Sequence, residues 1–206
     1  MNQAVLLEQL RIFLPKYLTP SEQKELWEEL RAFPSPKGFY LPHAEVEPDL
    51  LQGDGWKGFI AIDVVTSQRK ETRGIILSNS CDIDLSNDRT ALPNLIFAPL
   101  ISLAAYSARL EAADVERSRI LSQLETIRRQ EVSNIFFLPS MSYGPEESIV
   151  LLDTVHVQPV RMFVDGSRTR LFRLNQVAFY AFLIKLSIHF TRLQEGVKRF
   201  SSQAAS

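Results

Sequence analysis

The sequence predicts an α+β protein of one domain, residues 1–206, with short strands between helical stretches. Apolar residues recur at helical spacing near both ends and in a central stretch, and at strand spacing in the two stretches between them. An apolar fraction of 45% is enough to fill a sizeable core. The length fits one domain, since domains usually have roughly 100–200 residues.

The N-terminal stretch, residues 1–34, predicts a helical hairpin. Its first helix ends at Pro15, because proline cannot continue a helix. The second helix begins at Thr19–Ser21, where a hydroxyl can cap the first turn. We expect the hairpin to pack on the domain, and a partner-binding arm is the alternative. Glu8 interrupts the first apolar run, which argues against a signal peptide.

Residues 38–102 predict the first part of the sheet, because four short apolar runs are separated by Gly, Asp, Ser and Pro. These runs are Phe39–Leu41, Phe59–Val65, Gly74–Ser78 and Leu95–Pro99. The third run contains Ile75, Ile76 and Leu77, and successive apolar residues are typical of a strand covered on both faces. We therefore expect Arg73 and the segment Ser78–Asp84 at the rims of the sheet, where binding groups often lie.

Residues 103–132 return to helical spacing and predict one long inserted helix, or two helices broken near Ala112–Asp114. Residues 134–173 predict the second part of the sheet. Its expected strands are Ile135–Leu138, Ser148–Asp153, Val155–Val157 and Arg161–Phe163. The segment Val164–Arg168 predicts a turn, because its Asp-Gly pair favours a positive φ.

A closing helix is predicted over residues 175–200, with Asn175 as its cap. It is apolar nearly all round, so it must pack on several sides, against the N-terminal hairpin, the inserted helix or a second copy of the chain. We expect the last of these in part, as a symmetric homodimer with this helix at or near the two-fold axis. The stretch Val177–Phe190 includes Lys185 and His189 and is shorter than the roughly 20 residues that span a membrane. We expect no membrane association.

The charge balance and cysteine content narrow the classes of partner and compartment. A net charge of −1 argues against a nucleic-acid partner held by bulk electrostatics, although a local basic patch remains open. The single cysteine cannot form an internal disulfide, which fits a reducing compartment. We expect a cytoplasmic protein.

Four segments of the first sheet part stand in an order that resembles the MazF/PemK family of toxin endoribonucleases. They are Gly53-Asp54, Phe59–Val65, Glu71–Ser78 and Leu95–Ser102. The resemblance covers about a quarter of the chain. It implies an SH3-like bent antiparallel β-barrel, here with an N-terminal helical hairpin, an inserted long helix and a long C-terminal helix. Gly74 stands where the family has proline, and Cys81–Asp84 replaces an Asn-rich turn.

The resemblance implies that Arg73 faces the scissile phosphate and that the hydroxyl of Ser102 assists. A guanidinium suits this role because it is always charged and binds phosphate oxygens in a bidentate manner. Glu71 or Asp82 is the candidate base, and the chemistry needs no metal and no cofactor. The alternative is that Arg73 is a surface residue paired with Glu71 or Asp63.

Polar residues after the third run are the candidate substrate-binding group. They are Ser78, Asn79, Cys81, Asp82 and Asp84. The acidic neighbours of Cys81 disfavour a thiolate, so a small buried cysteine is the alternative. Binding of a hard cation by the carboxylates of this segment is a further interpretation. The spacing of these residues lacks the Gly and distal Glu of an EF-hand loop, so we expect a solvated turn.

A basic and aromatic cluster surrounds the turn at residues 164–168. It comprises Arg161, Arg168, Arg170, Arg173, Phe163 and Phe172. Such a cluster can follow a nucleic-acid strand by charge and stacking, and an ordinary hairpin rim is the alternative.

Two functions therefore compete. The first is a toxin-like or phage-defence protein that cleaves or binds single-stranded RNA. The second is a non-catalytic module that binds a protein partner through the barrel and its helices. The net charge favours the second function, and the placement of Arg73 and Ser102 favours the first.

Overall fold

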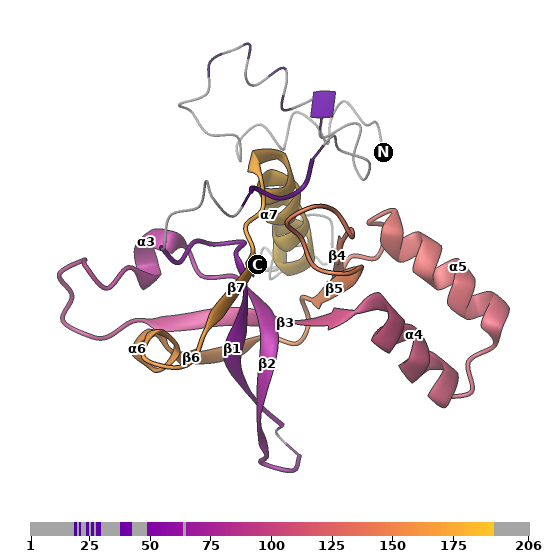
Figure 1. Cartoon of the computed structure of the whole chain (residues 1–206), viewed down its shortest axis with the longest axis horizontal. Coiled ribbons are helices and arrows are strands. Elements are labelled where there is room, and N and C mark those ends of the chain that lie inside the picture. The colour runs from indigo at the N-terminus through magenta and orange to yellow at the C-terminus, as the bar shows by residue number, and fades with distance from the viewer. Residues whose placement is uncertain are drawn as a thin grey trace, which may run out of the picture.

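A computed structural model gives the fold, which mixes helices with one antiparallel sheet, so the predicted α+β class is confirmed (Figure 1). The structure describes residues 19, 21, 24, 26, 28, 29, 38–42, 49–63 and 65–191. Most of the predicted N-terminal hairpin lies outside this range. The described residues of its second half, Ser21, Lys24, Leu26, Glu28 and Glu29, are helical.

The sheet has seven strands within the described residues and is open rather than closed. The strands are β1 (Gly55–Ile62), β2 (Arg69–Ile76), β3 (Asn94–Ser102), β4 (Ile135–Leu138), β5 (Ser148–Leu151), β6 (His156–Pro159) and β7 (Thr169–Phe172). Their order is β4-β5-β3-β2-β1-β7, and β6 also pairs with β3. The side chain of Gln158 links β6 to β1, because its Oε1 accepts the amide hydrogen of Ile60 at 2.9 Å.

Five helices connect or flank the strands in the described part of the chain. They are α3 (Ser80–Ile83), α4 (Leu103–Ala112), α5 (Arg117–Arg128), α6 (Val160–Val164) and α7 (Gln176–Thr191). In Figure 1, α4 and α5 form a pair at one end of the molecule, and α3 and α6 lie at the other. The β1–β2 hairpin projects away from the helices.

Alternation along β2 and β3 divides the core between the two faces of the sheet. Ile75 and Leu100 pack on one face, in a cluster that includes Phe182 of α7. Ile76 and Phe97 pack on the other face, in a cluster of aromatic rings. A third cluster packs α4 and α5 on β4 and β5. Both faces of β2 are buried at its C-terminal end, as the run of apolar residues predicted.

The strand boundaries differ from the predicted ones in a way that moves the candidate arginine. Arg73 is an internal residue of β2, opposite Lys57 of β1, and does not lie before the strand. Polar residues extend β2 toward the hairpin tip because that part of the sheet is exposed on both faces. The predicted strand at Phe39–Leu41 is reduced to a single bridge between Tyr40 and Leu174.

The region 103–132 contains two helices, α4 and α5, separated by a turn in which Asp114 has a φ of 55°, so of the two predictions for this region the one with a break near Ala112–Asp114 is confirmed. Three further elements differ from the sequence interpretation. The predicted strand Arg161–Phe163 is instead the short helix α6, which buries Val160 and Phe163 three residues apart. The one-turn helix α3 and the strand β7 were not predicted.

The closing helix α7 begins after Asn175, whose Oδ1 accepts the amide hydrogen of Ala178 at 2.9 Å, as expected of a cap. It buries Val177, Ala178, Tyr180, Phe182 and Lys185. Leu26 packs against Val177 and Tyr180. Residues 192–200 of the predicted helix lie outside the described residues. No helix in the described part is long and apolar enough to cross a membrane.

Candidate functional site

Three cations share one face of the β1–β2 hairpin and form what we call the cationic strip, Lys57, Arg69 and Arg73. Lys57 and Arg73 are direct cross-strand partners. Arg69 lies on the same face as Arg73, because alternate residues of a strand point the same way. The hairpin, residues 55–76, has four basic residues and two acidic ones, so it is locally basic in a chain whose net charge is −1.

Acidic side chains contact two of these cations only loosely. The Nζ of Lys57 lies 3.7 Å from Oε1 of Glu71, and an Nη of Arg73 lies 3.6 Å from Oε1 of Glu146. These side chains are between 37% and 61% exposed, so solvent weakens both ion pairs. Breaking the contact with Glu146 therefore costs little free energy, and the guanidinium of Arg73 is accessible to a ligand.

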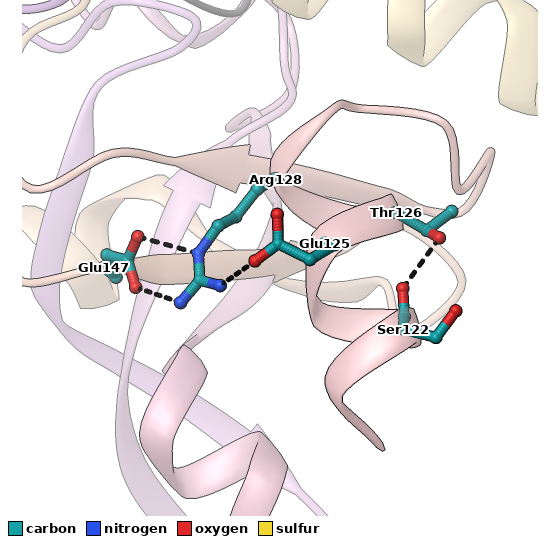
Figure 2. Close-up of polar contacts among 5 residues, drawn as sticks. All are labelled: Ser122, Glu125, Thr126, Arg128 and Glu147. Carbon is teal, nitrogen blue, oxygen red and sulfur yellow. Dashed lines mark hydrogen bonds and ion pairs between the residues drawn. The ribbon is translucent and has the colours of Figure 1, made fainter. Parts of the chain in front are cut away.

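A tighter ion-pair network fixes the segment that carries Glu146. Figure 2 shows Arg128 of α5 between two carboxylates. Its Nε and Nη2 donate to Glu147 at 3.0 and 2.8 Å, and its Nη1 donates to Glu125 at 2.7 Å. These hydrogen bonds raise the pKa of Arg128 further above its ordinary value. Because Glu147 is anchored in this way, its neighbour Glu146 is held beside Arg73.

The structure brings Ser102 to the same segment but gives its hydroxyl another role. Ser102 pairs with Ser148 at the end of β3, and the next amide, of Leu103, donates to the carbonyl of Glu147. The Oγ of Ser102 accepts the amide hydrogen of Ala105 at 3.2 Å, which caps α4.

The three proposed catalytic side chains make no hydrogen bond or ion pair with one another. Glu71 contacts Lys57, Arg73 contacts Glu146, and Ser102 contacts the backbone of α4. Of the two partners predicted for a structural Arg73, the chain uses neither Glu71 nor Asp63. Asp63 instead accepts the amide hydrogens of Val65 and Thr66, and these hydrogen bonds lower its pKa.

The candidate substrate-binding group, Ser78 to Asp84, lies beyond the C-terminal end of β2. Ser78 is five positions after Arg73, which is roughly 16 Å along a strand. Ser78 is 9% exposed, and its Oγ accepts the amide hydrogen of Ile96 at 2.8 Å. The structure therefore does not join this group to the cationic strip.

Local hydrogen bonds account for most polar residues of this segment. Asn79 caps α3 by accepting the amide hydrogen of Cys81, and Asp84 accepts from both the amide and the hydroxyl of Ser86. The hydrogen bonds from Ser86 lower the pKa of Asp84. Asp82 lies in the first turn of α3.

The alternative prediction for Cys81, a small buried cysteine, is wrong. Cys81 is exposed, because Ile83 occupies the one inward position of the short helix α3. Its carbonyl accepts hydrogen bonds from the side chains of Asn87 and Arg89. These bonds fold the following loop back onto the helix.

This loop lines an open cavity of about 350 Å³ with Arg161 of α6 on its wall. The wall includes Asp84, Asp88 and Arg89, so charges of both signs face the opening. Within the described residues, no three His, Cys, Asp or Glu side chains gather as metal ligands.

The basic and aromatic cluster is divided among three places. Arg161 lines the cavity, and Arg173 is buried against Asp54 with contacts of 2.6 to 3.1 Å. The guanidinium carbons of Arg168 and Arg170 lie 5.6 and 5.3 Å from the ring centre of Trp56. Sequence reasoning did not include Trp56 or Lys57, and both come from β1, far from these arginines in the chain.

One further titratable group is buried away from these sites. Lys185 of α7 is 8% exposed, and its Nζ donates to the carbonyl of Gln130 at 2.6 Å. Burial lowers the pKa of Lys185 to about 8. This lysine links α7 to the end of α5 and contacts none of the predicted site residues.

Comparison with known proteins identified no relative of this chain. No protein-family model matches the chain, and no curated protein matches it.

Proposed function

We propose that the chain binds single-stranded RNA along the cationic strip, with Arg73 contacting a phosphate. The observation that carries the proposal is the direct cross-strand pairing of Lys57 with Arg73. Like charges at opposed positions destabilise an antiparallel pair. Their carboxylate partners lie at 3.7 and 3.6 Å and are exposed, so they compensate this repulsion weakly. A phosphate backbone would be a stronger partner for both cations.

The shape of the hairpin favours a flexible strand as the ligand. The hairpin projects from the body of the molecule, so a single strand can follow its face without meeting the helices (Figure 1). Thr169 of β7 lies opposite Lys57 on the other side of β1. Its hydroxyl adds a neutral donor of the kind that contacts phosphate oxygens.

The resemblance to the toxin endoribonucleases extends the proposal to metal-independent cleavage by a cytoplasmic toxin-like or phage-defence protein. In this extended proposal the open sheet is a variant of the SH3-like barrel. Arg73 stabilises the charge that develops on the phosphate, and Glu71 acts as base. Glu71 would first have to leave Lys57, and Ser102 would have to leave the cap of α4. The geometry therefore supports binding better than cleavage.

Fluorescence anisotropy with a labelled single-stranded RNA tests the binding. Lys57→Gln and Arg73→Gln should each weaken binding and reduce the steepness of the salt dependence by about 0.7, the value for one phosphate contact on a single strand. Arg119→Gln, an exposed arginine of α5, is the matched control and should change neither quantity. Incubation of the same RNA with the protein in the presence of EDTA tests cleavage. The unaltered chain should still cleave the RNA without metal, and Arg73→Gln should not.

Two results would contradict the proposal. Equal losses in Arg73→Gln and Arg119→Gln would mean that the binding is unspecific. No salt-dependent binding by the unaltered chain would remove RNA as the ligand.

The second candidate function, a protein-binding module, is favoured by exposed apolar side chains on β3 and β6. Ile96 and Val157 are direct cross-strand partners and are 38% and 58% exposed. Val155 is 37% exposed beside them. A partner chain would bury these side chains. Val157→Lys should then abolish capture of that partner and leave RNA binding unchanged.

A further inference from the structure

Arg168, at the turn before β7, rests on two aromatic rings. Its guanidinium carbon lies 5.6 Å from the ring centre of Trp56 and 5.8 Å from that of Phe163. The two rings meet edge to face with centres 6.0 Å apart, so together they form a fixed surface. Within the described residues Arg168 makes no ion pair. It is a cation positioned by two rings, with no counter-ion in the described part of the chain.

Two hydrogen-bond donors at this place have no acceptor in the described part of the chain. They are Nη1 of Arg168 and Nε1 of Trp56, and both atoms are shielded from solvent. Trp56 as a whole is 6% exposed. Buried donors without acceptors destabilise a fold, so native proteins seldom retain them without a reason. Each of these donors would gain stability from an acceptor.

A close backbone contact at Gly58 fixes the position of Arg168. Gly58 forms the irregular step between Lys57 and Phe59 of β1 and has a φ of 108°. A Cβ at Gly58 would lie 2.5 Å from the carbonyl oxygen of Ser167 and 3.1 Å from Cα of Arg168. Only glycine allows β1 and the turn to approach so closely.

The surrounding charge favours an anion with more than one negative charge. Arg170 lies 5.3 Å from the centre of the same indole ring. Burial lowers the pKa of Arg170, and the positive charge of Arg173 lowers it further. The nearest buried carboxylate, Asp54, is committed to Arg173 through three hydrogen bonds. A dianion at this indole ring would therefore meet the guanidinium groups of both Arg168 and Arg170.

This place is separate from the cationic strip. Trp56 and Arg170 are cross-strand partners, and so are Lys57 and Thr169. Because consecutive residues of a strand point to opposite faces, Trp56 and Lys57 lie on different sides of β1. A ligand here does not depend on RNA binding by Lys57 and Arg73.

We infer that Arg168, Arg170 and Trp56 form a binding site for a dianionic phosphate group. Since the unpaired donors are shielded, the guanidinium of Arg168 must rotate outward from the rings when the phosphate enters. The phosphate oxygens then accept hydrogen bonds from Arg168 and from the indole N–H of Trp56. The same site would take free phosphate or the phosphate of a nucleotide.

The indole of Trp56 reports directly on this binding. The chain has two tryptophans, so Trp27→Phe leaves one indole, whose N–H resonance can be followed by NMR. Titration with inorganic phosphate should give a saturable downfield shift, while chloride and acetate at equal ionic strength should not. Titration with a nucleoside 5′-monophosphate shows whether a nucleotide is preferred to the free ion.

Three substitutions in this background separate the site from its surroundings. Arg168→Gln should weaken phosphate binding at least about tenfold, the effect of losing one charge-assisted contact. Arg168→Lys retains the charge over the rings and protects against a failure to fold, and it should still weaken binding because the paired donors are lost. Arg161→Gln, an exposed arginine of α6, is the matched control and should have no effect.

The inference is overturned if phosphate produces no saturable shift, or if Arg168→Lys and Arg168→Gln both bind as tightly as the unaltered chain. Arg73→Gln distinguishes this failure from a failure of RNA binding. It should leave the phosphate-dependent shift intact even where it abolishes binding of RNA.

Discussion

The buried ion pair between Asp54 and Arg173 should be the most sensitive polar contact in the fold. Asp54 directly precedes β1 and Arg173 directly follows β7, and the two residues are 1% and 9% exposed. Arg173 donates three hydrogen bonds to the carboxylate and one to the carbonyl of Asp49. Burial pushes the pKa of Asp54 upward, and the hydrogen bonds and charge of Arg173 oppose that change.

Asp54→Asn removes the counter-charge and leaves a guanidinium buried against a neutral amide. Breaking a buried pair from one side costs about 3–5 kcal/mol, a large part of a typical stability of about 5–15 kcal/mol. Arg173→Met should cost a similar amount, because it strands the carboxylate. The double variant Asp54→Asn, Arg173→Met leaves neither charge of this pair and should cost much less than the two single changes together.

Urea unfolding at neutral pH gives the three free energies of this cycle. Arg119→Gln serves as a control for the loss of one positive charge and should change the free energy of unfolding by less than about 0.5 kcal/mol. The reasoning fails if either single variant loses less than about 1 kcal/mol, or if the double variant loses the full sum.

Three other outcomes follow from particular contacts. The side chain of Gln130 donates to and accepts from the backbone of Phe137 at 2.7 and 3.0 Å, so Gln130→Ala should lower the free energy of unfolding by about 1–3 kcal/mol per orphaned group, measured by urea unfolding. Lys185 has a pKa of about 8 in the fold and 10.5 when unfolded, so the unfolded chain binds more protons between these values. Stability should therefore rise with pH from about 8 to 10.5, and Lys185→Met should remove this rise in thermal scans. Ile188 and Phe190 of α7 are 42% and 58% exposed, so a dimer through this helix should weaken in Ile188→Glu and Phe190→Glu, seen by light scattering.

Elements whose signal lies within a few residues could be predicted from the sequence. The run Ile75 to Leu77 indicated a segment covered on both faces, and Asn175 indicated the start of a helix; the structure has both. The strand β7 escaped prediction because its four residues, Thr169–Phe172, begin with two polar residues and become a strand only by pairing with β1. Short segments are decided by such distant partners rather than by their own composition.

The candidate site was likewise predictable only where the signal was local in the sequence. Arg73 was identified as a phosphate-binding candidate, but the sequence could not show that Lys57 lies opposite it, because that depends on a register shift at Gly58. The segment Ser78–Asp84 was grouped with Arg73 from proximity in sequence, and the extended chain carries it beyond the C-terminal end of β2, five or more positions from Arg73. A strand separates its two ends by about 3.3 Å per residue, so closeness in sequence is a poor guide to closeness in a site.

The position of the buried ion pair also separates stability from binding in this molecule. Gly55 and Phe172 are cross-strand partners, so Asp54 and Arg173 hold the first residues of β1 to the last residues of β7. The cationic strip begins two residues later and runs toward the exposed end of the hairpin. Loose exposed ion pairs contribute little to folding, so Arg73→Gln should reduce affinity for an anionic strand without lowering the melting temperature. Asp54→Asn should reduce both the affinity and the melting temperature, because the ion pair holds together the ends of β1 and β7 from which the cationic strip extends.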